Sequence, residues 1–301
     1  MITTSQIKKI ALEVGFDLCG VTPCQHLREN ETRFYEWLDN GYNSNLGYLS
    51  RNLDKRFDTR KLVEGAHTVI VCAESYKNHL SEGYPADFKT KIASYACTTD
   101  YHTTIKEMLR RIATRLAEIE PNLKGRMFVD TAPLLEKQLA VEAGLGWIGR
   151  QSLLITPRFG SYVLLGELVI NEQVDKYDEP FAGSRCGRCN NCIDSCPTGA
   201  IVAPKVIDTR RCISCHTIEC ASEVEHPLDG WIFGCDMCQS CCPHNHKAPM
   251  HTSPLFDPTF DPQSISAQEW LSMSEQEFNT TFSKTPLKRS GLERIKGNIK
   301  I

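Results

Sequence analysis

The cysteine-rich stretch at residues 186–197, CGRCNNCIDSCP, decides how the rest of the chain is interpreted. Its spacing is C-x2-C-x2-C-x3-C-P. Three thiolates placed two residues apart can wrap one corner of an iron–sulfur cubane, while the fourth, followed by proline, points away toward a second cluster. A structural zinc site would need two ligand pairs on separated knuckles instead. The pattern therefore favours [4Fe–4S] binding, of the bacterial ferredoxin kind, over zinc.

A second motif follows at residues 235–243, CDMCQSCCP, and keeps the spacing C-x2-C-x3-C-P. Its missing first ligand must come from upstream, and we assign it to Cys212. Each motif lends its last cysteine to the cluster of the other motif. The two predicted ligand sets are Cys186, Cys189, Cys192 and Cys242 for cluster one, and Cys196, Cys212, Cys235 and Cys238 for cluster two.

Three cysteines of this region, Cys215, Cys220 and Cys241, are left without a cluster. Cys241 competes with Cys242 for one ligand position, and the proline that follows Cys242 decides for the latter. The chain has 15 cysteines, of which 11 lie in residues 186–242. So dense a group in a chain without a secretory signal indicates metal or redox chemistry rather than disulfides.

Length and charge limit what else the chain can be. The 301 residues are 41% hydrophobic and 24% charged, with a formal net charge of −3, so the composition is that of a globular protein. A uniformly basic coat for nucleic acid is excluded, although a local basic patch is not. No apolar run approaches the roughly 18 residues of a membrane-spanning helix, and the N-terminus lacks a secretory signal. We therefore expect a cytoplasmic protein.

Residues 1–175 are predicted to form an α/β catalytic domain, because strands and helices alternate. A free two-cluster electron carrier would need far fewer residues, so these must do something else. Neither a G-x-G-x-x-G fingerprint nor a Walker A motif supports a nucleotide site. The predicted elements are a helix carrying Ile7, Ile10, Ala11 and Val14 behind a cap at 3–5, a strand at 68–73, a helix at 103–119, a strand at 126–130, a helix at 133–144 and a strand at 161–170.

Composition changes near Asp175, where Pro, Gly and charged residues indicate a linker at 175–185. We expect a ferredoxin-like domain with two [4Fe–4S] clusters over 176–250. A third segment, 251–301, contains short helical patterns at 266–273 and 274–282. It ends in a basic tail with six basic side chains and one acid from Lys284 onward.

The chain resembles the epoxyqueuosine reductase family over about residues 1–250, and more weakly beyond. Together the matching segments are highly specific, whereas the cysteine motif alone would not be. They are LGYLSRNLDKRFDTR (46–60), DYH (100–102), VDTAPLLEK (129–137), GLGWIGRQSLLITPRFGSYVLLGEL (144–168), CGRCNNCIDSCPTGAIVAPKVIDTRRCIS (186–214) and GCDMCQSCCPHN (234–245).

The resemblance implies a cobalamin-dependent oxidoreductase of tRNA queuosine biosynthesis. Its catalytic domain would be a nitroreductase-like α/β domain that binds cobalamin, and two [4Fe–4S] clusters would reduce that cofactor. The reaction would convert epoxyqueuosine to queuosine at the tRNA anticodon wobble position, with two electrons, two protons and water as by-product. An external low-potential donor would supply the electrons, and nothing demands more than a monomer.

Asp130 matches the proton donor of that family. Epoxide opening creates an alkoxide, which a positioned acid protonates as it forms. We expect burial beside the corrinoid to raise the pKa of Asp130 so that it holds a proton. The alternative is that Asp130 caps a helix starting near Pro133.

Further matched positions are expected in the cobalamin and substrate pocket. His102 is expected to bind by hydrogen bonds rather than as a cobalt ligand, and Arg56 has the alternative of a solvated face beside Asp54 and Asp58. The set is Arg56, Tyr101, His102, Arg150, Gln151, Ser152 and Ser214.

The chain departs from the family pattern at several places. Arg150 and Gln151 replace lysine and asparagine, and Cys215 with His216 stands where an aromatic residue is usual after Cys212. A C-terminal helical-repeat extension, common in the family, has no counterpart here. Phosphate contacts with tRNA are therefore expected from the basic tail and from Arg51, Lys55, Arg56, Arg60 and Lys61.

Two other functions stay open at this point. One is a different cobalamin-dependent reductase of the same architecture, such as a reductive dehalogenase. The other is a ferredoxin-type adaptor that passes electrons to a partner enzyme and binds no cobalamin.

Overall fold

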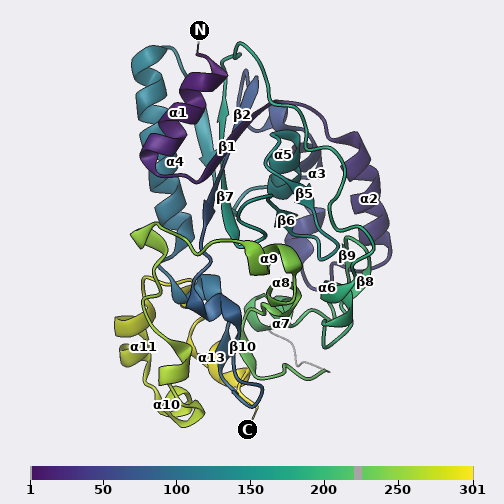
Figure 1. Ribbon diagram of the computed structural model, residues 1–301, viewed down its shortest axis with the longest axis vertical. Helices are drawn as coiled ribbons and strands as arrows, with labels where there is room; N and C mark the ends of the chain where they lie inside the picture. The colour runs from purple at the N-terminus through teal and green to yellow at the C-terminus, as the bar shows by residue number, and fades with distance from the viewer. Residues whose placement is uncertain (1, 220–225, 301) are drawn as a thin grey trace.

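The computed structural model describes residues 2–219 and 226–300, and its centre is an antiparallel four-stranded sheet (Figure 1). The strand order is β1-β2-β7-β4. Strand β2 is buried along its whole length, because the β-branched run that starts at Thr68 packs apolar side chains on both sheet faces. The four strands are β1 (Leu18–Pro23), β2 (Thr68–Ser75), β4 (Gly125–Phe128) and β7 (Val163–Ile170).

Helices cover both faces of this sheet. On one face, α1 (Thr4–Val14) and α4 (Tyr101–Ile119) pack side by side, with Ile7, Ile105 and Leu109 in a common core (Figure 1). On the other face, α5 (Glu136–Glu142) packs through Leu139 and Ala140. The predicted α/β class is confirmed, and the helix at 103–119 and the strands at 68–73 and 161–170 lie where the sequence predicts them.

The first helix begins as its sequence predicts. The Thr3 hydroxyl accepts a hydrogen bond from the backbone N–H of Gln6, whose side chain binds back to the backbone of Thr3. This capping box satisfies two amide groups that would otherwise be unpaired. The helix ends at Gly15, whose φ of 117° is readily adopted only by glycine.

Shorter elements complete the chain. The α-helices are α2 (Arg28–Asp39), α3 (Leu53–Phe57), α6 (Asn191–Asp194), α7 (Ile213–Ile218), α8 (Met237–Ser240), α9 (Pro243–Lys247), α10 (Ala267–Ser272), α11 (Glu275–Phe282), α12 (Leu287–Ser290) and α13 (Leu292–Gly297). The 3₁₀ turns are η1 (Gly47–Ser50), η2 (Thr59–Lys61), η3 (His79–Glu82), η4 (Ser94–Cys97), η5 (Pro254–Phe256) and η6 (Pro262–Ser264). The short strands are β3 (Lys91–Ile92), β5 (Trp147–Ile148), β6 (Leu154–Ile155), β8 (Ile201–Ala203), β9 (Val206–Ile207) and β10 (Trp231–Phe233).

The C-terminal segment folds back onto the rest of the chain. Strand β10 pairs in parallel with β3, and α10, α11 and α13 bury Trp270, Phe278 and Ile295 in one core with Ile92 and Phe233. The short helices predicted at 266–273 and 274–282 are present as α10 and α11. The predicted boundaries at 175 and 250 are therefore crossed by a shared core.

The basic side chains of the C-terminal segment bind within the protein. Arg289 forms an ion pair of 3.1 Å with Glu219, and Lys296 Nζ donates to the backbone carbonyl of Met273 at 2.8 Å. Arg294 donates to the backbone carbonyl of Ile218. These three side chains therefore help to hold the segment in place.

A buried polar network joins the second cysteine motif to the sheet. Asn245, at the end of that motif, accepts a 2.6 Å hydrogen bond from the backbone N–H of Ser161, which precedes β7. Lys77, which follows β2, donates to the backbone carbonyls of Asn245 and Ala248 at 2.8 and 2.6 Å. Gly160 leaves room for this contact, since a Cβ there would lie 2.1 Å from Asn245 Oδ1.

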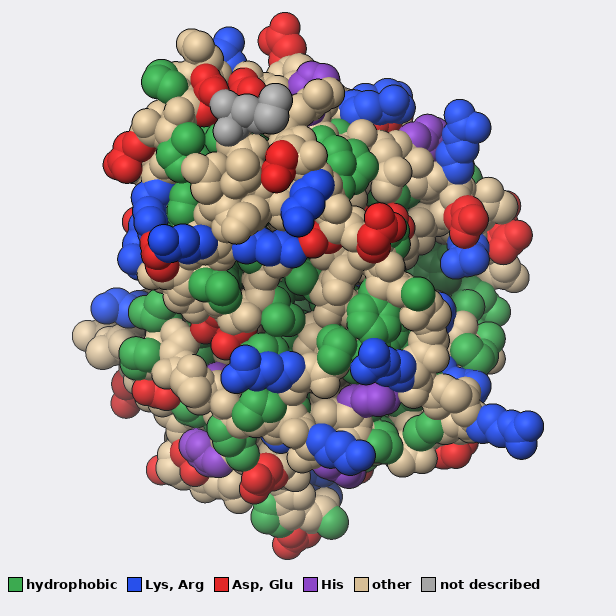
Figure 2. All heavy atoms as spheres, turned by 45° about the horizontal axis from the view of Figure 1, so that its top comes forward, with side chains coloured by type: hydrophobic (Ala, Val, Ile, Leu, Met, Phe, Trp, Pro, Cys, Tyr) green, Lys and Arg blue, Asp and Glu red, His purple; other side chains and the backbone are tan. Residues whose placement is uncertain are grey.

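The surface carries charges of both signs. Figure 2 shows acidic and basic side chains interspersed over one face, which is not uniformly basic. Across residues 2–219 and 226–300, no helix is both long enough and apolar enough to cross a membrane.

One close approach gives a stability prediction. A Cβ on Gly20 of β1 would lie 2.1 Å from the backbone carbonyl oxygen of Ala143, so Gly20→Ala must push β1 and the end of α5 apart. We expect a loss of about 1–3 kcal/mol in the free energy of unfolding, measured by urea denaturation. Gly47→Ala is the matched control, because nothing lies within 4 Å of its added Cβ. Equal urea midpoints for the two variants would contradict this packing.

Candidate functional site

Asp130 lies in a loop between β4 and α5, two residues beyond the strand end. Its φ of 51° is in the left-handed region, which is uncommon for a residue other than glycine. Helix α5 starts at Glu136, with Leu135 rather than Asp130 at its N-cap. The predicted helix start at Pro133 is therefore too early, and Asp130 does not cap the helix. Its side chain is 51% exposed and free to meet a ligand.

Two neighbours from the start of α4 hold the Asp130 carboxylate. The Tyr101 hydroxyl donates to Asp130 Oδ2 at 2.6 Å, and His102 Nε2 lies 3.7 Å from the same oxygen. The Tyr101 and His102 rings are stacked, with centroids 4.1 Å apart. Residues 100–102 and residues 129–133, which are far apart in the sequence, therefore meet at the Asp130 carboxylate.

Asp100 fixes the His102 side chain and is also the N-cap of α4. Its carboxylate accepts from the backbone N–H of His102 at 3.0 Å and lies 2.7 Å from His102 Nδ1. A side-chain oxygen at this position satisfies an amide of the first helical turn. The cap thus sets the start of the helix and also orients the imidazole toward Asp130.

The charges of this group differ from the sequence expectation. Partial burial raises the pKa of Asp130, but hydrogen bonds from His102 and Tyr101 outweigh that effect and leave the pKa below its usual value. Burial lowers the pKa of His102, yet Asp100 and Asp130 raise it overall to about 9. The expectation of a raised pKa concerned Asp130 beside the corrinoid, whereas among the described residues alone the His102 imidazole lowers that pKa. A His102 pKa of about 9 places a proton on its imidazole at neutral pH.

Two acidic residues and a lysine that the sequence reasoning did not assign lie behind Asp130. The backbone N–H of Asp130 donates to Glu136 Oε1 at 2.6 Å. Glu167, on β7, is fully buried, and Glu136 is its neighbour. Lys137 donates to the backbone carbonyl of Ser152 at 2.8 Å. An acid inside the apolar strand SYVLLGELVI was the available signal for Glu167, since buried acids are rare without a partner.

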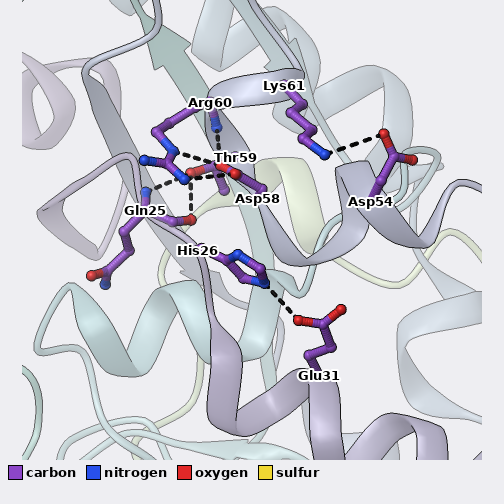
Figure 3. A network of polar contacts seen from close by, with 8 residues as sticks. All are labelled: Gln25, His26, Glu31, Asp54, Asp58, Thr59, Arg60 and Lys61. Carbon is purple, nitrogen blue, oxygen red and sulfur yellow. Dashed lines mark hydrogen bonds and ion pairs between the residues drawn. The ribbon is translucent and has the colours of Figure 1, made fainter.

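Arg56, on α3, is 7% exposed, so it does not lie on a solvated face. Its Nε has no hydrogen-bond partner among the described residues, and its guanidinium lies 5.6 Å from the Phe34 ring centroid. Figure 3 shows how the following residues are anchored: the Arg60 guanidinium binds Asp58, and Thr59 binds the backbone of Gln25.

The loop between β5 and β6 carries three further predicted pocket residues. Gln151 is buried with its Nε2 unpaired, and Ser152 has a φ of 63° with a buried, unpaired Oγ, within the described part of the chain. Arg150 points elsewhere, because it binds Asn190 and the backbone carbonyl of Gly187 in the first cysteine loop. Ser214 lies on α7, next to Cys212.

The thiols predicted for cluster one lie near one another. Burial raises the pKa of Cys242, and the proximity of Cys186 and Cys189 raises it further. Cys242 packs with Cys186 around Trp147 and Ile155, and Trp147 Nε1 donates to Cys186 Sγ at 3.4 Å. The last cysteine of the second motif therefore reaches the first motif, as the exchange of ligands requires.

The thiols predicted for cluster two are grouped in the same way. Burial raises the pKa of Cys235, with smaller contributions from its neighbours Cys212 and Cys196. Burial raises the pKa of Cys238, and the nearby Cys235 and Cys212 raise it further. The backbone N–H of Ala200 donates to Cys196 Sγ at 3.2 Å. Hydrogen bonds to sulfur of this kind tune iron–sulfur clusters.

The leftover cysteines have different surroundings. Cys241 lies near Cys242 and Cys189 and its thiol hydrogen-bonds with Ser195, while Cys215 is buried beside Cys212, Leu46 and Leu49. Cys220 lies outside the described residues. Within the part of the chain described, no three Cys, His, Asp or Glu side chains converge on the position of one metal ion.

Lys137 lies in the neighbourhood of both regions. Burial lowers the pKa of Lys137, and the nearby Asp130, Glu136 and Cys238 oppose that shift. An α/β domain with an acid–base group thus borders a two-cluster electron path. These features define an iron–sulfur oxidoreductase.

Comparison with known proteins identifies the family. Residues 56–131 match the family model described as epoxyqueuosine reductase QueG, DUF1730, and residues 185–245 match the 4Fe-4S double cluster binding domain. The epoxyqueuosine reductase of Cellulophaga algicola is 39% identical, over 97% of this chain and 95% of the relative. The chain therefore belongs to the epoxyqueuosine reductase family.

Solved structures agree with this assignment. An epoxyqueuosine reductase from Bacillus subtilis, with its aspartate-bearing catalytic loop swung out of the active site, superposes with a TM-score of 0.88 at 25% identity, over 98% of this chain and 79% of that one. A family member bound to an epoxyqueuosine-modified tRNA-Tyr stem loop gives 0.85 at 26%, with the same coverage. A catabolic reductive dehalogenase, 14% identical over 97% of this chain and 37% of its own, shares the fold at a TM-score of 0.50.

The ligand assignment of the adjacent cysteines can be tested by metal content. Cys242→Ala removes a predicted ligand of cluster one, so we expect iron to fall from about eight to about four atoms per chain. The neighbouring change Cys241→Ala is the matched control and should leave about eight. Both variants are reconstituted without oxygen and analysed for iron and sulfide. Loss of iron in Cys241→Ala alone would reverse the assignment.

The protonation of His102 gives a second prediction. Asp100→Asn keeps an N-cap oxygen but removes a carboxylate that raises the His102 pKa. The imidazolium should then lose its proton at a pH well below 9, closer to its ordinary value of 6.5. An NMR titration of the imidazoles in the oxidised protein measures this, with His102→Gln assigning the resonance. An unchanged midpoint would show that Asp100 does not hold the charge.

Proposed function

We propose that this protein reduces epoxyqueuosine in tRNA to queuosine. The ring carbons lose the bridging epoxide oxygen and regain their double bond, while two electrons and two protons convert that oxygen to water. The observation that carries the proposal is the Asp130–His102–Tyr101 group beside the two sets of thiols. Family membership supports it, and so does the related structure that holds an epoxyqueuosine-modified stem loop.

Unpaired buried atoms support cobalamin as the second cofactor. Arg56 Nε, Gln151 Nε2 and Ser152 Oγ are buried without hydrogen-bond partners in the described residues, whereas buried polar groups are nearly always paired. Their residues were assigned to the pocket from the sequence, so they fit a polar ligand that enters there. When bound, cobalamin supplies a low-valent metal centre that delivers electrons to carbon.

The protein's own part in the chemistry is the supply of protons. Asp130 is half-exposed and placed to hand a proton to the epoxide oxygen as charge develops on it. His102 holds that proton at neutral pH, since its pKa is about 9, and lies 3.7 Å from Asp130 Oδ2. Tyr101 orients the carboxylate through its 2.6 Å hydrogen bond.

The electron path follows from the two thiol groups. Cluster one would be held by Cys186, Cys189, Cys192 and Cys242, and cluster two by Cys196, Cys212, Cys235 and Cys238. Because each motif lends its last cysteine to the cluster of the other, the two clusters would lie close together and form one path. An external low-potential donor would reduce the clusters, and a monomer suffices for this arrangement.

Contacts with tRNA phosphates would come from basic residues that are not already paired. Arg56 is buried and Arg60 binds Asp58 at 2.7–2.8 Å, so neither is available. Lys55 lines a cavity of about 190 Å³ together with Arg126 and Thr131, the residue after Asp130. Lys61 also lines this cavity but is paired with Asp54 at 3.6 Å. Arg51 is exposed nearby. Such groups bind phosphate through charge.

The proposed organisation keeps the three segments predicted from the sequence. Residues 1–175 would carry the catalytic chemistry and 176–250 the clusters. Residues 251–301 would hold both in place by packing against Ile92 and Phe233. Since the substrate is tRNA, the protein would act in the cytoplasm.

The decisive experiment combines cofactor content with turnover. Protein reconstituted without oxygen is analysed for iron, incubated with cob(II)alamin and a strong reductant, and assayed by mass spectrometry on epoxyqueuosine-containing tRNA. About eight irons with loss of one oxygen from the nucleoside is the expected result. Bound cobalamin without turnover would indicate a cobalamin-dependent reductase with a different substrate. Failure to bind cobalamin would indicate a protein that only carries electrons.

The proton role of Asp130 is tested in the same assay. Asp130→Asn keeps the size of the side chain but cannot donate a carboxyl proton, so kcat should fall by about 10²–10⁴-fold. Iron content and cobalamin binding should stay unchanged. Asp39→Asn, an exposed change on α2, is the control and should keep full activity. Full activity of Asp130→Asn would remove the residue from the mechanism.

A further inference from the structure

The left-handed backbone at Asp130 is held by a side chain from the next helix. The backbone N–H of Asp130 donates to Glu136 Oε1 at 2.6 Å. A non-glycine residue at φ 51° costs free energy and persists only where its surroundings compensate. The Glu136 carboxylate accepts the hydrogen bond of that amide, so it stabilises the conformation that aims the Asp130 side chain.

Glu136 is itself backed by a second acid. Glu167 is 0% exposed, in the middle of β7 and opposite Phe128 of β4. Both of its carboxylate oxygens lack a donor among the described residues, and its side chain lies within hydrogen-bond reach of Glu136. Two acceptors in contact repel each other unless one carries a proton. The two carboxyl groups therefore share a proton, which turns the contact into a hydrogen bond.

The surrounding charges favour this protonated state. Burial raises the pKa of Glu136 to about 7, and the Asp130 carboxylate adds to that effect. Burial also raises the pKa of Glu167, with Glu136 contributing. Lys137 is the neighbouring cation on α5. Glu167 pairs with Val71 of β2 and Phe128 of β4, so apolar residues lie beside it on the adjacent strands. The ammonium of Lys137 is directed to the carbonyl of Ser152 instead.

We infer that Glu136 and Glu167 form a positioning pair, in which Glu167 hydrogen-bonds Glu136 and Glu136 holds the Asp130 loop in its catalytic conformation. The inference rests on the proposed function for its meaning in turnover. The related Bacillus subtilis structure, with its catalytic loop swung out of the active site, supports a loop with two positions. In this chain Glu167 would hold the loop in the catalytic position, because Glu167 belongs to β7 of the central sheet.

The test measures the loop and the reaction separately. Glu136→Ala removes the acceptor of the Asp130 amide, so hydrogen exchange in the peptide around residues 129–135 should speed up. The same variant should lower kcat about 10–100-fold, because a small misplacement of a catalytic group costs rate. The KM for tRNA, iron content and cobalamin binding should change little. The exchange measurement needs no turnover, so it tests the loop even if the proposed substrate is wrong.

Conservative variants keep the inference open to refutation. Glu136→Gln retains an acceptor and Glu167→Gln retains a donor. Both variants should therefore show loop hydrogen exchange and a kcat close to those of the parent protein. Glu167→Ala should instead behave like Glu136→Ala. Glu142→Ala is the matched control. The Glu142 carboxylate lies on the same helix but accepts a hydrogen bond from Gln138 Nε2 instead. If Glu136→Ala leaves both loop exchange and kcat within about twofold of the parent, or if Glu136→Gln is as impaired as Glu136→Ala, the pair does not position Asp130.

Discussion

The contact that the rest of the structure depends on is the buried junction at Asn245. Its side chain binds the backbone before β7, and Lys77 binds its backbone from the end of β2. Buried hydrogen bonds of this kind are costly to break, because each lost partner leaves an unsatisfied polar group. The junction attaches the second cysteine motif to the two central strands, and β7 pairs with β4, the strand that leads into Asp130. The cysteine module and the Asp130 loop are thereby held by one sheet.

Local patterns predicted most of the sheet and its helices. The run at 68–73 and the strand at 161–170 are β-branched and apolar, and the first helix has its cap and period in the sequence. The start of α5 was predicted three residues early, because the loop after β4 is fixed by partners distant in sequence. The basic tail was expected to contact tRNA phosphates, yet Arg289 and Arg294 bind Glu219 and the backbone of Ile218. Only the fold brings those groups together.

The site shows the same division between local and distant information. The family resemblance pointed to Asp130, Tyr101 and His102, and the structure joins them at one oxygen. Their charges were not predictable from position, because the His102 pKa depends on two carboxylates that flank it. Glu136 and Glu167 were missed for a related reason. Their contact links a helix start to the middle of a strand, and no sequence spacing signals it.

The exchange of cysteines between the motifs also bears on how the protein is made. Cys242 reaches back to Cys186 and Cys189, so the ribosome delivers the last thiol of cluster one only after the whole module has been synthesised. With the proposed ligands, neither cubane would have a complete set on a nascent chain that stops short of the second motif. Iron and sulfide would then be loaded late in biosynthesis, and truncated chains would be released without either cluster secured.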